Sequence, residues 1–254
     1  MTLEKEQALE DGLVQTIFRP CAEFLVTLAA PAVGERLLDV GCGSAIVARV
    51  AAERQPLLRA AHGFDFEQDA LDVARRAVAD HPQANLFEFW RADAEDPQAY
   101  RGQLWDVCTA QHLLQHAPSM LAPLREALGP KGRAVIATWP ASSSQCPAYD
   151  FLYLAAGEGV KAIGMPIASL RQQLQQARFQ VVTEVETKLR TPPVAPAGFL
   201  RQYLEGKQHP PANINEIVAR AEVVPLAAEK ATMIRSGDLM QFTIAMNVII
   251  AMAE

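Results

Sequence analysis

The 254-residue sequence lacks the marks of several protein classes. It contains no cluster of lysine or arginine, and its formal net charge is −6, so neither duplex nucleic acid nor an anionic membrane surface is an expected partner. No apolar run approaches the ~20 residues that a membrane helix needs. The most apolar stretch, 244–253, is interrupted by Asn247 and is predicted to be a buried strand. The N-terminus has no basic start followed by an apolar segment, so we expect a cytoplasmic protein without membrane insertion.

Cysteines are also few and are spaced far apart. The sequence has no C-x-x-C pair, and no histidine stands near a cysteine at the spacing of a metal site. We therefore expect reduced thiols and no bound metal. The four cysteines are Cys21, Cys42, Cys108 and Cys146.

Up to residue 139 the chain alternates between strand-like and helix-like patterns. Two helical pieces, separated by Pro20, are expected within residues 1–30. Strands are then predicted at 37–40, 60–65, 85–90, 105–110 and 133–139, and helices at 45–54, 68–79 and 120–128. This alternation predicts an α/β fold, a Rossmann-like doubly wound sheet that is largely parallel and has helices on both faces.

The pattern changes after residue 140. Two segments rich in proline, serine and aromatic residues interrupt it, and a helix at 169–177, a strand at 179–187 and a final strand at 239–252 are still recognisable. We therefore divide the chain into an N-terminal helical segment (1–30), a core (31–139), a cap insert (140–168), a core helix and strand (169–190), a second cap insert (191–237) and a final core strand (238–254).

The turn after the first core strand is the sharpest feature. Gly41 and Gly43 stand at alternate positions between a strand and a helix, where the missing side chains let a ligand approach the backbone. A nicotinamide dinucleotide would need a third glycine where this chain has Ile46. Asp39 instead suits a ligand with a cationic amino-acid group, such as S-adenosylmethionine (SAM). A purely structural turn is the alternative at this stage.

An acidic residue ends the second predicted strand, and another follows the third. Asp65 lies 22 residues after Gly43, close to the ~20-residue spacing of acids that bind ribose hydroxyls. Asp93 and the backbone of Ala94 could bind an adenine, and Phe66 could lie against the adenine or the ribose. The alternatives are a helix cap for Asp65, a solvated acidic loop around Asp93 and ordinary packing for Phe66.

Taken together, these segments resemble the class I SAM-dependent methyltransferases, most closely the small-molecule branch called methyltransferase type 11 or ubiquinone-biosynthesis-like. The similar segments are 34–43 (GERLLDVGCG), 63–65 (GFD), 92–94 (ADA), 114–118 (LQHAP) and 128–133 (LGPKGR), followed by Trp139. The resemblance covers roughly residues 15–140 and, more loosely, the final strands. Two positions depart from the family pattern: Ala45 stands where glycine is common, and Ser119 stands where aspartate often follows the proline.

The resemblance implies a sheet of about seven strands with the last antiparallel, SAM as cofactor, and methyl transfer to an O, N or C atom of a small hydrophobic metabolite, secondary-metabolite or quinone-like. The cofactor-binding residues are then expected to be Asp39, Gly41, Cys42, Gly43, Ser44, Asp65, Phe66, Asp93, Ala94 and Gln111. Two alternatives stay open: a SAM-binding cyclase or rearrangement catalyst that transfers no methyl group, and a non-enzymatic partner subunit that does not bind SAM. A homodimer is compatible with each.

A catalytic base, if one is used, is expected after the fourth strand, because ligands of such sheets lie beyond the carboxyl ends of the strands. His112 and His116 are the candidates; the alternative is that they contact the cofactor or pack. The cap inserts are expected to form a lid with an aromatic acceptor pocket. The predicted pocket residues are Trp139, Tyr149, Tyr153, Phe199 and Tyr203.

Overall fold

A computed structural model describes residues 10–205, 211–221, 234–236 and 239–253. The chain divides into two compact units. The core unit comprises Cys21–Thr138, Met165–Glu186 and Asn247–Glu254, and the second unit comprises Met1–Pro20, Trp139–Gly164 and Thr187–Met246. Parts of the predicted segments 1–30 and 191–237 lie outside the described residues.

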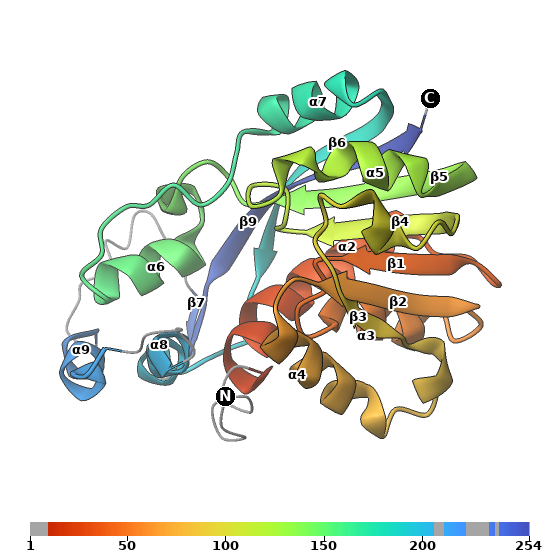
Figure 1. Cartoon of the computed structure of the whole chain (residues 1–254). Helices are drawn as coiled ribbons and strands as arrows, with labels where there is room; N and C mark the ends of the chain where they lie inside the picture. Colours follow the sequence, from red (N-terminus) through yellow and green to blue (C-terminus); the bar gives the residue numbers. More distant parts are fainter. Residues whose placement is uncertain (1–9, 206–210, 222–233, 237–238, 254) are drawn as a thin grey trace. The chain divides into compact units, whose positions relative to one another are not determined.

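A seven-stranded sheet forms the centre of the fold, in the order β3-β2-β1-β4-β5-β9-β6. Its strands are β1 (Arg36–Val40), β2 (Ala60–Asp65), β3 (Phe89–Arg91), β4 (Trp105–Gln111), β5 (Leu128–Thr138), β6 (Phe179–Arg190) and β9 (Thr243–Ala253). The pairs among β1 to β5 are parallel, and β9 runs antiparallel to β5 (Figure 1). The predicted Rossmann-like sheet of about seven strands with an antiparallel last strand is confirmed.

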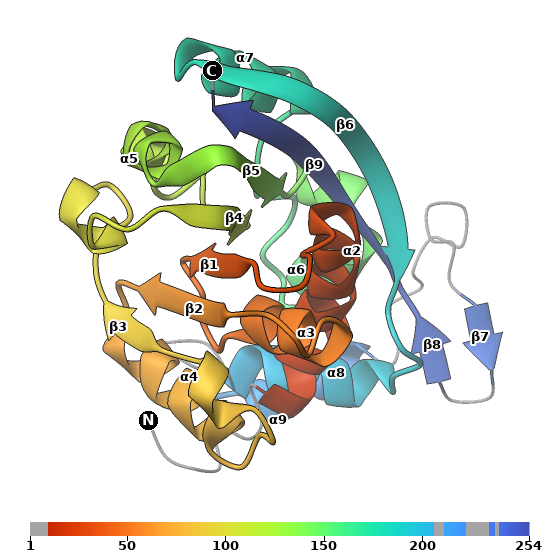
Figure 2. The same cartoon turned by 90° about the vertical axis from the view of Figure 1, so that its right-hand side faces the viewer.

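Helices cover the sheet because each presents an apolar stripe to it. The helices of the core unit are α2 (Arg19–Ala29), α3 (Ile46–Arg54), α4 (Gln68–Ala79), α5 (Leu121–Glu126) and α7 (Ile167–Gln176). Leu121 and Leu124 of α5 and Leu170 of α7 join one hydrophobic cluster with Ile136 of the sheet. Helices α2 and α3 lie on the opposite side of the strands from α5 (Figure 2).

Three predicted boundaries were wrong. The strand expected at 85–90 is shortened to β3, because Ala84–Leu86 forms a 3-10 turn, η2. The helix expected at 120–128 ends at Glu126, and β5 already begins at Leu128. Gly132 permits this early start, since a Cβ there would lie only 2.8 Å from the carbonyl oxygen of Trp105. The last strand is divided at Phe242, whose N–H bonds to the hydroxyl of Thr191 instead.

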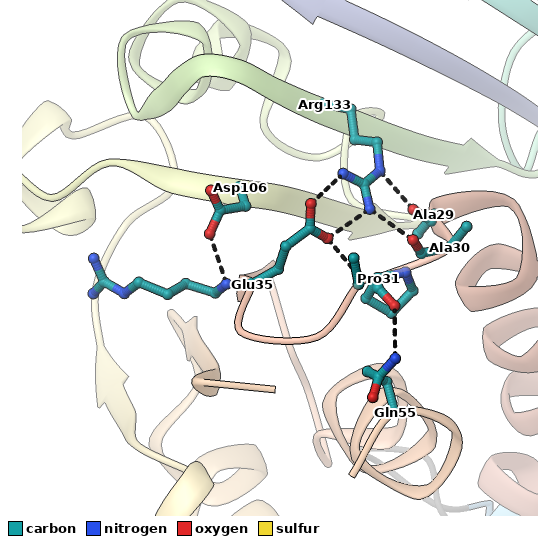
Figure 3. Close-up of polar contacts among 9 residues, drawn as sticks. Ala29, Ala30, Pro31, Glu35, Gln55, Asp106 and Arg133 are labelled. Atoms are coloured by element: carbon teal, nitrogen blue, oxygen red, sulfur yellow. Dashed lines mark hydrogen bonds and ion pairs between the residues drawn. The ribbon is translucent and has the colours of Figure 1, made fainter. Parts of the chain in front are cut away.

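An arginine cluster holds the end of α2 against the sheet where β1 begins (Figure 3). Arg133 of β5 donates through Nε to the carbonyl of Ala29 at 2.6 Å and through Nη2 to the carbonyl of Ala30 at 2.8 Å. Its guanidinium also binds both carboxylate oxygens of Glu35, at 3.0 and 2.8 Å. The hydrogen bond from Arg133 lowers the pKa of Glu35. This bidentate pair stabilises the connection between α2 and β1.

The second unit is mainly helical in its described part. It contains the π-helical η1 (Glu10–Phe18), α6 (Pro147–Ala155), α8 (Pro196–Glu205), α9 (Ile214–Ala221) and a hairpin of β7 (Ile234–Ser236) and β8 (Leu239–Gln241). Phe151, Phe199 and Phe242 form its aromatic centre, with ring centroids 4.8–6.3 Å apart. That residues 140–168 and 191–237 act as a cap stays a prediction.

Candidate functional site

The turn between β1 and α3 places three residues in the left-handed region of backbone space. Gly41 has a φ of 68°, Gly43 of 52° and Ala45 of 62°. Glycine adopts this conformation freely, whereas alanine does so at a cost of about 1 kcal/mol. Position 45, where the similar methyltransferases commonly have glycine, therefore still requires a left-handed backbone. Ala45 adopts this conformation under strain. Ala45 is also the residue directly before α3.

Backbone hydrogen bonds fix this turn against β2. The N–H groups of Gly41 and Cys42 both donate to the carbonyl of Phe64, at 2.9 and 3.0 Å. The side chain of Cys42 is buried against Gly63, where an added Cβ would lie 2.7 Å from the Cys42 Cβ. Burial raises the pKa of the Cys42 thiol. Cys42, which was predicted to bind the cofactor, thus packs its side chain against β2.

Asp65 joins the glycine turn to the start of α4. Its Oδ2 accepts a hydrogen bond from the N–H of Gly43 at 2.8 Å, and its Oδ1 accepts one from the N–H of Glu67 at 2.9 Å. The second contact closes a turn just before α4, whose N-cap is Glu67 and which has no side-chain cap, so Asp65 does not cap the helix. Each carboxylate oxygen has a further lone pair, so the same group can also accept hydrogen bonds from a ligand.

Asp39 is a buried carboxylate with one oxygen unsatisfied. Asp39 is only 1% exposed. Its Oδ1 accepts a hydrogen bond from the hydroxyl of Thr109 at 2.8 Å, and its Oδ2 has no hydrogen-bond partner among the described residues. Burial raises the pKa of Asp39 to about 7; the Thr109 hydrogen bond opposes this shift and the charge of Asp65 adds to it. A buried acceptor without a donor is costly, and a cationic group or a water would satisfy it.

The loop after β3 is organised around Asp93. The Oδ1 of Asp93 accepts a hydrogen bond from the N–H of Glu95 at 3.0 Å. Glu95 in turn accepts one from the N–H of Ser119 at 2.8 Å, which connects this loop to the segment after β4. The hydroxyl of Tyr100 stabilises the loop by donating a hydrogen bond to the carbonyl of Ala94 at 3.1 Å.

These segments enclose a cavity of about 270 Å³ at the carboxyl ends of β1, β2 and β3. Predicted site residues on its wall are Gly41, Asp65, Phe66, Asp93, Ala94 and His116. Residues that were not among the predicted site residues complete it: Phe64, Ala92, Glu95, Leu113 and Ala117. Ala92 precedes Asp93 and Glu95 follows it by two residues, so both could have been inferred from it, whereas nothing in the sequence marked Leu113. Asp39, Cys42, Gly43, Ser44, Gln111 and His112 are not on this wall.

The charge of the cavity restricts what it can bind. Its described lining carries three carboxylates, those of Asp65, Asp93 and Glu95, and neither lysine nor arginine. A phosphate or pyrophosphate would face repulsion there without a compensating cation. Hydroxyl, amino or cationic groups would find acceptors. The volume lies below the ~300–1,000 Å³ of common small-molecule sites, which fits one part of a larger ligand.

The two histidines after β4 occupy different surroundings. His112 is buried and has a backbone φ of 59°. Its backbone N–H donates a hydrogen bond to the carbonyl of Ala137 at 2.8 Å. Burial lowers the pKa of His112 to about 3, so its imidazole is neutral at physiological pH and a weak base. His116 lies on the cavity wall. Gln111 ends β4 and is half-buried.

The predicted acceptor residues all fall in the second unit. Four of them form a continuous run: Trp139 contacts Tyr149 at 4.9 Å between ring centroids, Tyr149 contacts Tyr153 at 5.8 Å, and Tyr153 contacts Tyr203 at 6.1 Å. Phe199, only 1% exposed, belongs to the phenylalanine centre instead. An acceptor pocket built by these five residues stays a prediction.

Neither a metal centre nor a membrane helix is found in the described part of the chain. No group of three or more His, Cys, Asp or Glu side chains there could hold a metal ion. None of the described helices is long and apolar enough to cross a bilayer. The four cysteines are buried free thiols.

The fold and the cavity define a class: a Rossmann-like domain with a cavity beyond the carboxyl ends of its parallel strands, where ligands of such sheets bind. A family model described as a methyltransferase domain matches residues 13–184, about two thirds of the chain. The chain belongs to this methyltransferase-domain family, as the resemblance drawn from the sequence predicted.

Individual relatives match over shorter segments. The chain is 28% identical over 103 residues to the ubiquinone biosynthesis O-methyltransferase of Vibrio vulnificus, covering 41% of the chain and 42% of that protein. It is 30% identical over 121 residues to the aklanonic acid methyltransferase DauC of a Streptomyces species, covering 48% of the chain and 54% of that protein. The match thus spans about half the length of these relatives, or less.

Among solved structures, that of the [4+2]-cyclase SpnF superimposes with a TM-score of 0.56 at 18% identity. The superposition covers 92% of this chain and 81% of that protein. At this identity the likeness concerns the fold alone.

Proposed function

We propose that this chain is a SAM-dependent methyltransferase that acts on a small hydrophobic acceptor. The observation that carries the proposal is the cavity beside the glycine turn, which is lined by three carboxylates and by no described lysine or arginine. Such a wall suits a nucleoside that carries a cationic group and no phosphate. SAM is a ligand of this kind, and when bound it supplies a methyl group activated by a sulfonium.

The residues present fit this cofactor. Asp65 would accept hydrogen bonds from the ribose hydroxyls while the N–H groups of Gly43 and Glu67 hold its carboxylate in place. Asp93 and Ala94 would bind the adenine, and Phe66 would border it. The unpartnered Oδ2 of Asp39 is an acceptor for an ammonium group or for a water that binds one.

Methyl transfer is an in-line displacement, so the protein mainly has to align the reactants and exclude water. An O–H or N–H acceptor also needs a proton acceptor. His116, on the cavity wall, and His112, directly after β4, remain the candidates in the core unit. The low pKa of His112 favours His116 of the two, because a base with a pKa near 3 removes protons poorly.

The acceptor is proposed to be hydrophobic, secondary-metabolite or quinone-like. The names of the two relatives, one concerned with ubiquinone and one with aklanonic acid, support this class. The run of aromatic rings from Trp139 to Tyr203 in the second unit is a suitable surface for such a molecule.

The decisive experiment incubates the protein with methyl-labelled SAM and a panel of hydrophobic phenols, catechols and quinols. Label in the acceptor together with stoichiometric S-adenosylhomocysteine is the expected result. Conversion of an acceptor without label transfer would replace this proposal by a SAM-binding cyclase or rearrangement catalyst. Absence of SAM binding by calorimetry would contradict both and leave the partner-subunit alternative.

A further inference from the structure

Phe66 is an exposed aromatic residue whose position packing does not explain. It follows Asp65 at the end of β2, is 58% exposed and lies on the cavity wall. A ring left in water forfeits the burial that normally stabilises phenylalanine. Its place is therefore set by something other than the hydrophobic core.

Arg91 makes the contacts that hold Phe66. Its Nε donates a hydrogen bond to the carbonyl of Phe66 at 2.9 Å, and its Cζ lies 5.4 Å from the centroid of the Phe66 ring. In the described part of the chain, the side chain of Arg91 makes both its hydrogen bond and its ring contact with Phe66. One side chain thereby fixes both the backbone and the ring of Phe66.

The sheet brings the two residues together. Arg91 ends β3 and is the register partner of Asp65 on β2, and the N–H of Ala92 donates to the carbonyl of Asp65 at 3.0 Å. The next residue after Arg91 already belongs to the cavity wall, whereas Arg91 itself does not. Its side chain therefore acts on the cavity through Phe66.

We propose that Arg91 is a positioning residue, which holds the Phe66 ring as a preformed wall for the nucleobase of the cofactor. The inference rests on the proposed function, since it requires that a nucleoside occupies this cavity. A ring already fixed loses less side-chain entropy when a ligand stacks on it, so affinity is gained without a new contact. The guanidinium, as a delocalised cation, can lie over the ring while it keeps its hydrogen bond.

Arg101 offers a matched control. Its guanidinium lies 3.8 Å from the centroid of the Trp90 ring and is paired with Glu88, so it makes a closer ring contact and an ion pair as well. Neither Trp90 nor Arg101 lines the cavity. Arg101→Met should therefore affect folding at least as much as Arg91→Met, and should leave nucleoside binding unchanged.

The test measures S-adenosylhomocysteine affinity by calorimetry in full-length variants, together with Tm. Arg91→Met is expected to weaken binding about 3- to 10-fold, with Arg91→Lys in between, on the scale of an exposed cation–π contact plus one hydrogen bond. In a Phe66→Leu background the same Arg91→Met change should alter affinity less than about 2-fold, because the positioned ring is gone.

The outcomes separate the two proposals. Wild-type protein that fails to bind S-adenosylhomocysteine would contradict the proposed function itself. Wild-type protein that binds while Arg91→Met binds equally well would overturn only the role of Arg91. An equal loss with and without the Phe66 ring, or an equal loss in Arg101→Met, would show that Arg91 acts through general stability.

Discussion

The backbone N–H of Gly43 donates a hydrogen bond to Oδ2 of Asp65, with 2.8 Å between the two atoms. This contact joins the glycine turn after β1 to the acid at the end of β2. It explains why a spacing of 22 residues between them is informative: the parallel register of β1 and β2 places Asp39 opposite Gly63, so both strand ends meet at the same edge.

Asp65→Ala removes this contact together with the acceptor proposed for the ribose hydroxyls. We expect S-adenosylhomocysteine affinity to fall by about 10- to 100-fold, the scale of one to a few kcal/mol for a charged hydrogen-bond partner. Calorimetry measures it, with the exposed Asp69→Ala on α4 as control. Undiminished affinity in Asp65→Ala would show that the carboxylate serves only the glycine turn and the turn before α4.

The two glycines of the turn should respond differently to alanine. A Cβ on Gly41 would lie 2.7 Å from the Leu113 side chain, whereas a Cβ on Gly43 would meet nothing within 4 Å. Gly41→Ala should therefore destabilise the protein by about 2–4 kcal/mol and Gly43→Ala by about 1 kcal/mol, the cost of the left-handed backbone alone. Denaturant unfolding tests this. Leu113→Ala should recover part of the Gly41→Ala loss, and equal losses at both glycines would refute the steric explanation.

Two buried groups are expected to give opposite pH dependence of stability. Asp39 has a folded pKa of about 7, above its ordinary 3.8, so its contribution is lost as pH rises from about 4 to 7. His112 has a folded pKa of about 3, below its ordinary 6.5, so its contribution is lost as pH falls below 6.5. Between pH 4 and 6.5 the two slopes, each at most about 1.4 kcal/mol per pH unit, cancel.

Single variants should separate these slopes. Relative to wild type, the free energy of unfolding of Asp39→Asn should increase from pH 4 to 7 and then level off. That of His112→Gln should increase as pH falls from 6.5 to 4. Unfolding curves across pH 4–8 provide the measurement, and pH-independent differences in both variants would contradict the assigned burial effects.

The strand and helix pattern predicted most of the core because buried parallel strands and amphipathic helices leave clear periodicities. Short β3 and the early start of β5 were mispredicted because each depends on a tertiary contact, such as that of Gly132 with the Trp105 backbone. In the site, acids after strand ends were recognisable by position. Leu113 was not, because its place over Gly41 follows from the backbone path after His112 and from no local sequence signal.

The position of His116 on the cavity wall leads to a kinetic prediction. Because His116 is the favoured proton acceptor, His116→Ala should lower kcat by about 10²-fold or more and remove one limb of the pH–rate profile, whereas His81→Ala, outside the cavity wall, should change neither kcat nor KM. Steady-state kinetics on an acceptor identified by the labelling experiment would distinguish the roles. A several-fold rise in the KM for SAM with little change in kcat would instead show that His116 mainly contacts the cofactor.

Arg133→Met should be the most destabilising arginine substitution of those considered. It removes the Arg133 hydrogen bonds to the carbonyls of Ala29 and Ala30 and leaves the half-buried Glu35 with only the Ala32 N–H as donor, for which we expect a loss of about 2–4 kcal/mol. Arg125→Met, which removes one hydrogen bond to the Ala177 carbonyl, should lower the free energy of unfolding by about 1 kcal/mol. S-adenosylhomocysteine affinity should be unchanged in both, and a large loss of affinity in Arg133→Met would contradict the separation of this cluster from the cavity.

The separation of the Arg133 cluster from the cavity affects how such a protein can evolve. The Arg133 cluster secures the chain where β1 begins, and the cavity opens where β1 ends, so the five residues of one strand stand between two independent tasks. Substitutions around the cavity can alter ligand preference while the opposite edge keeps the sheet assembled. The residues that line the cavity can then vary by drift at one edge alone, without a compensating change at the other.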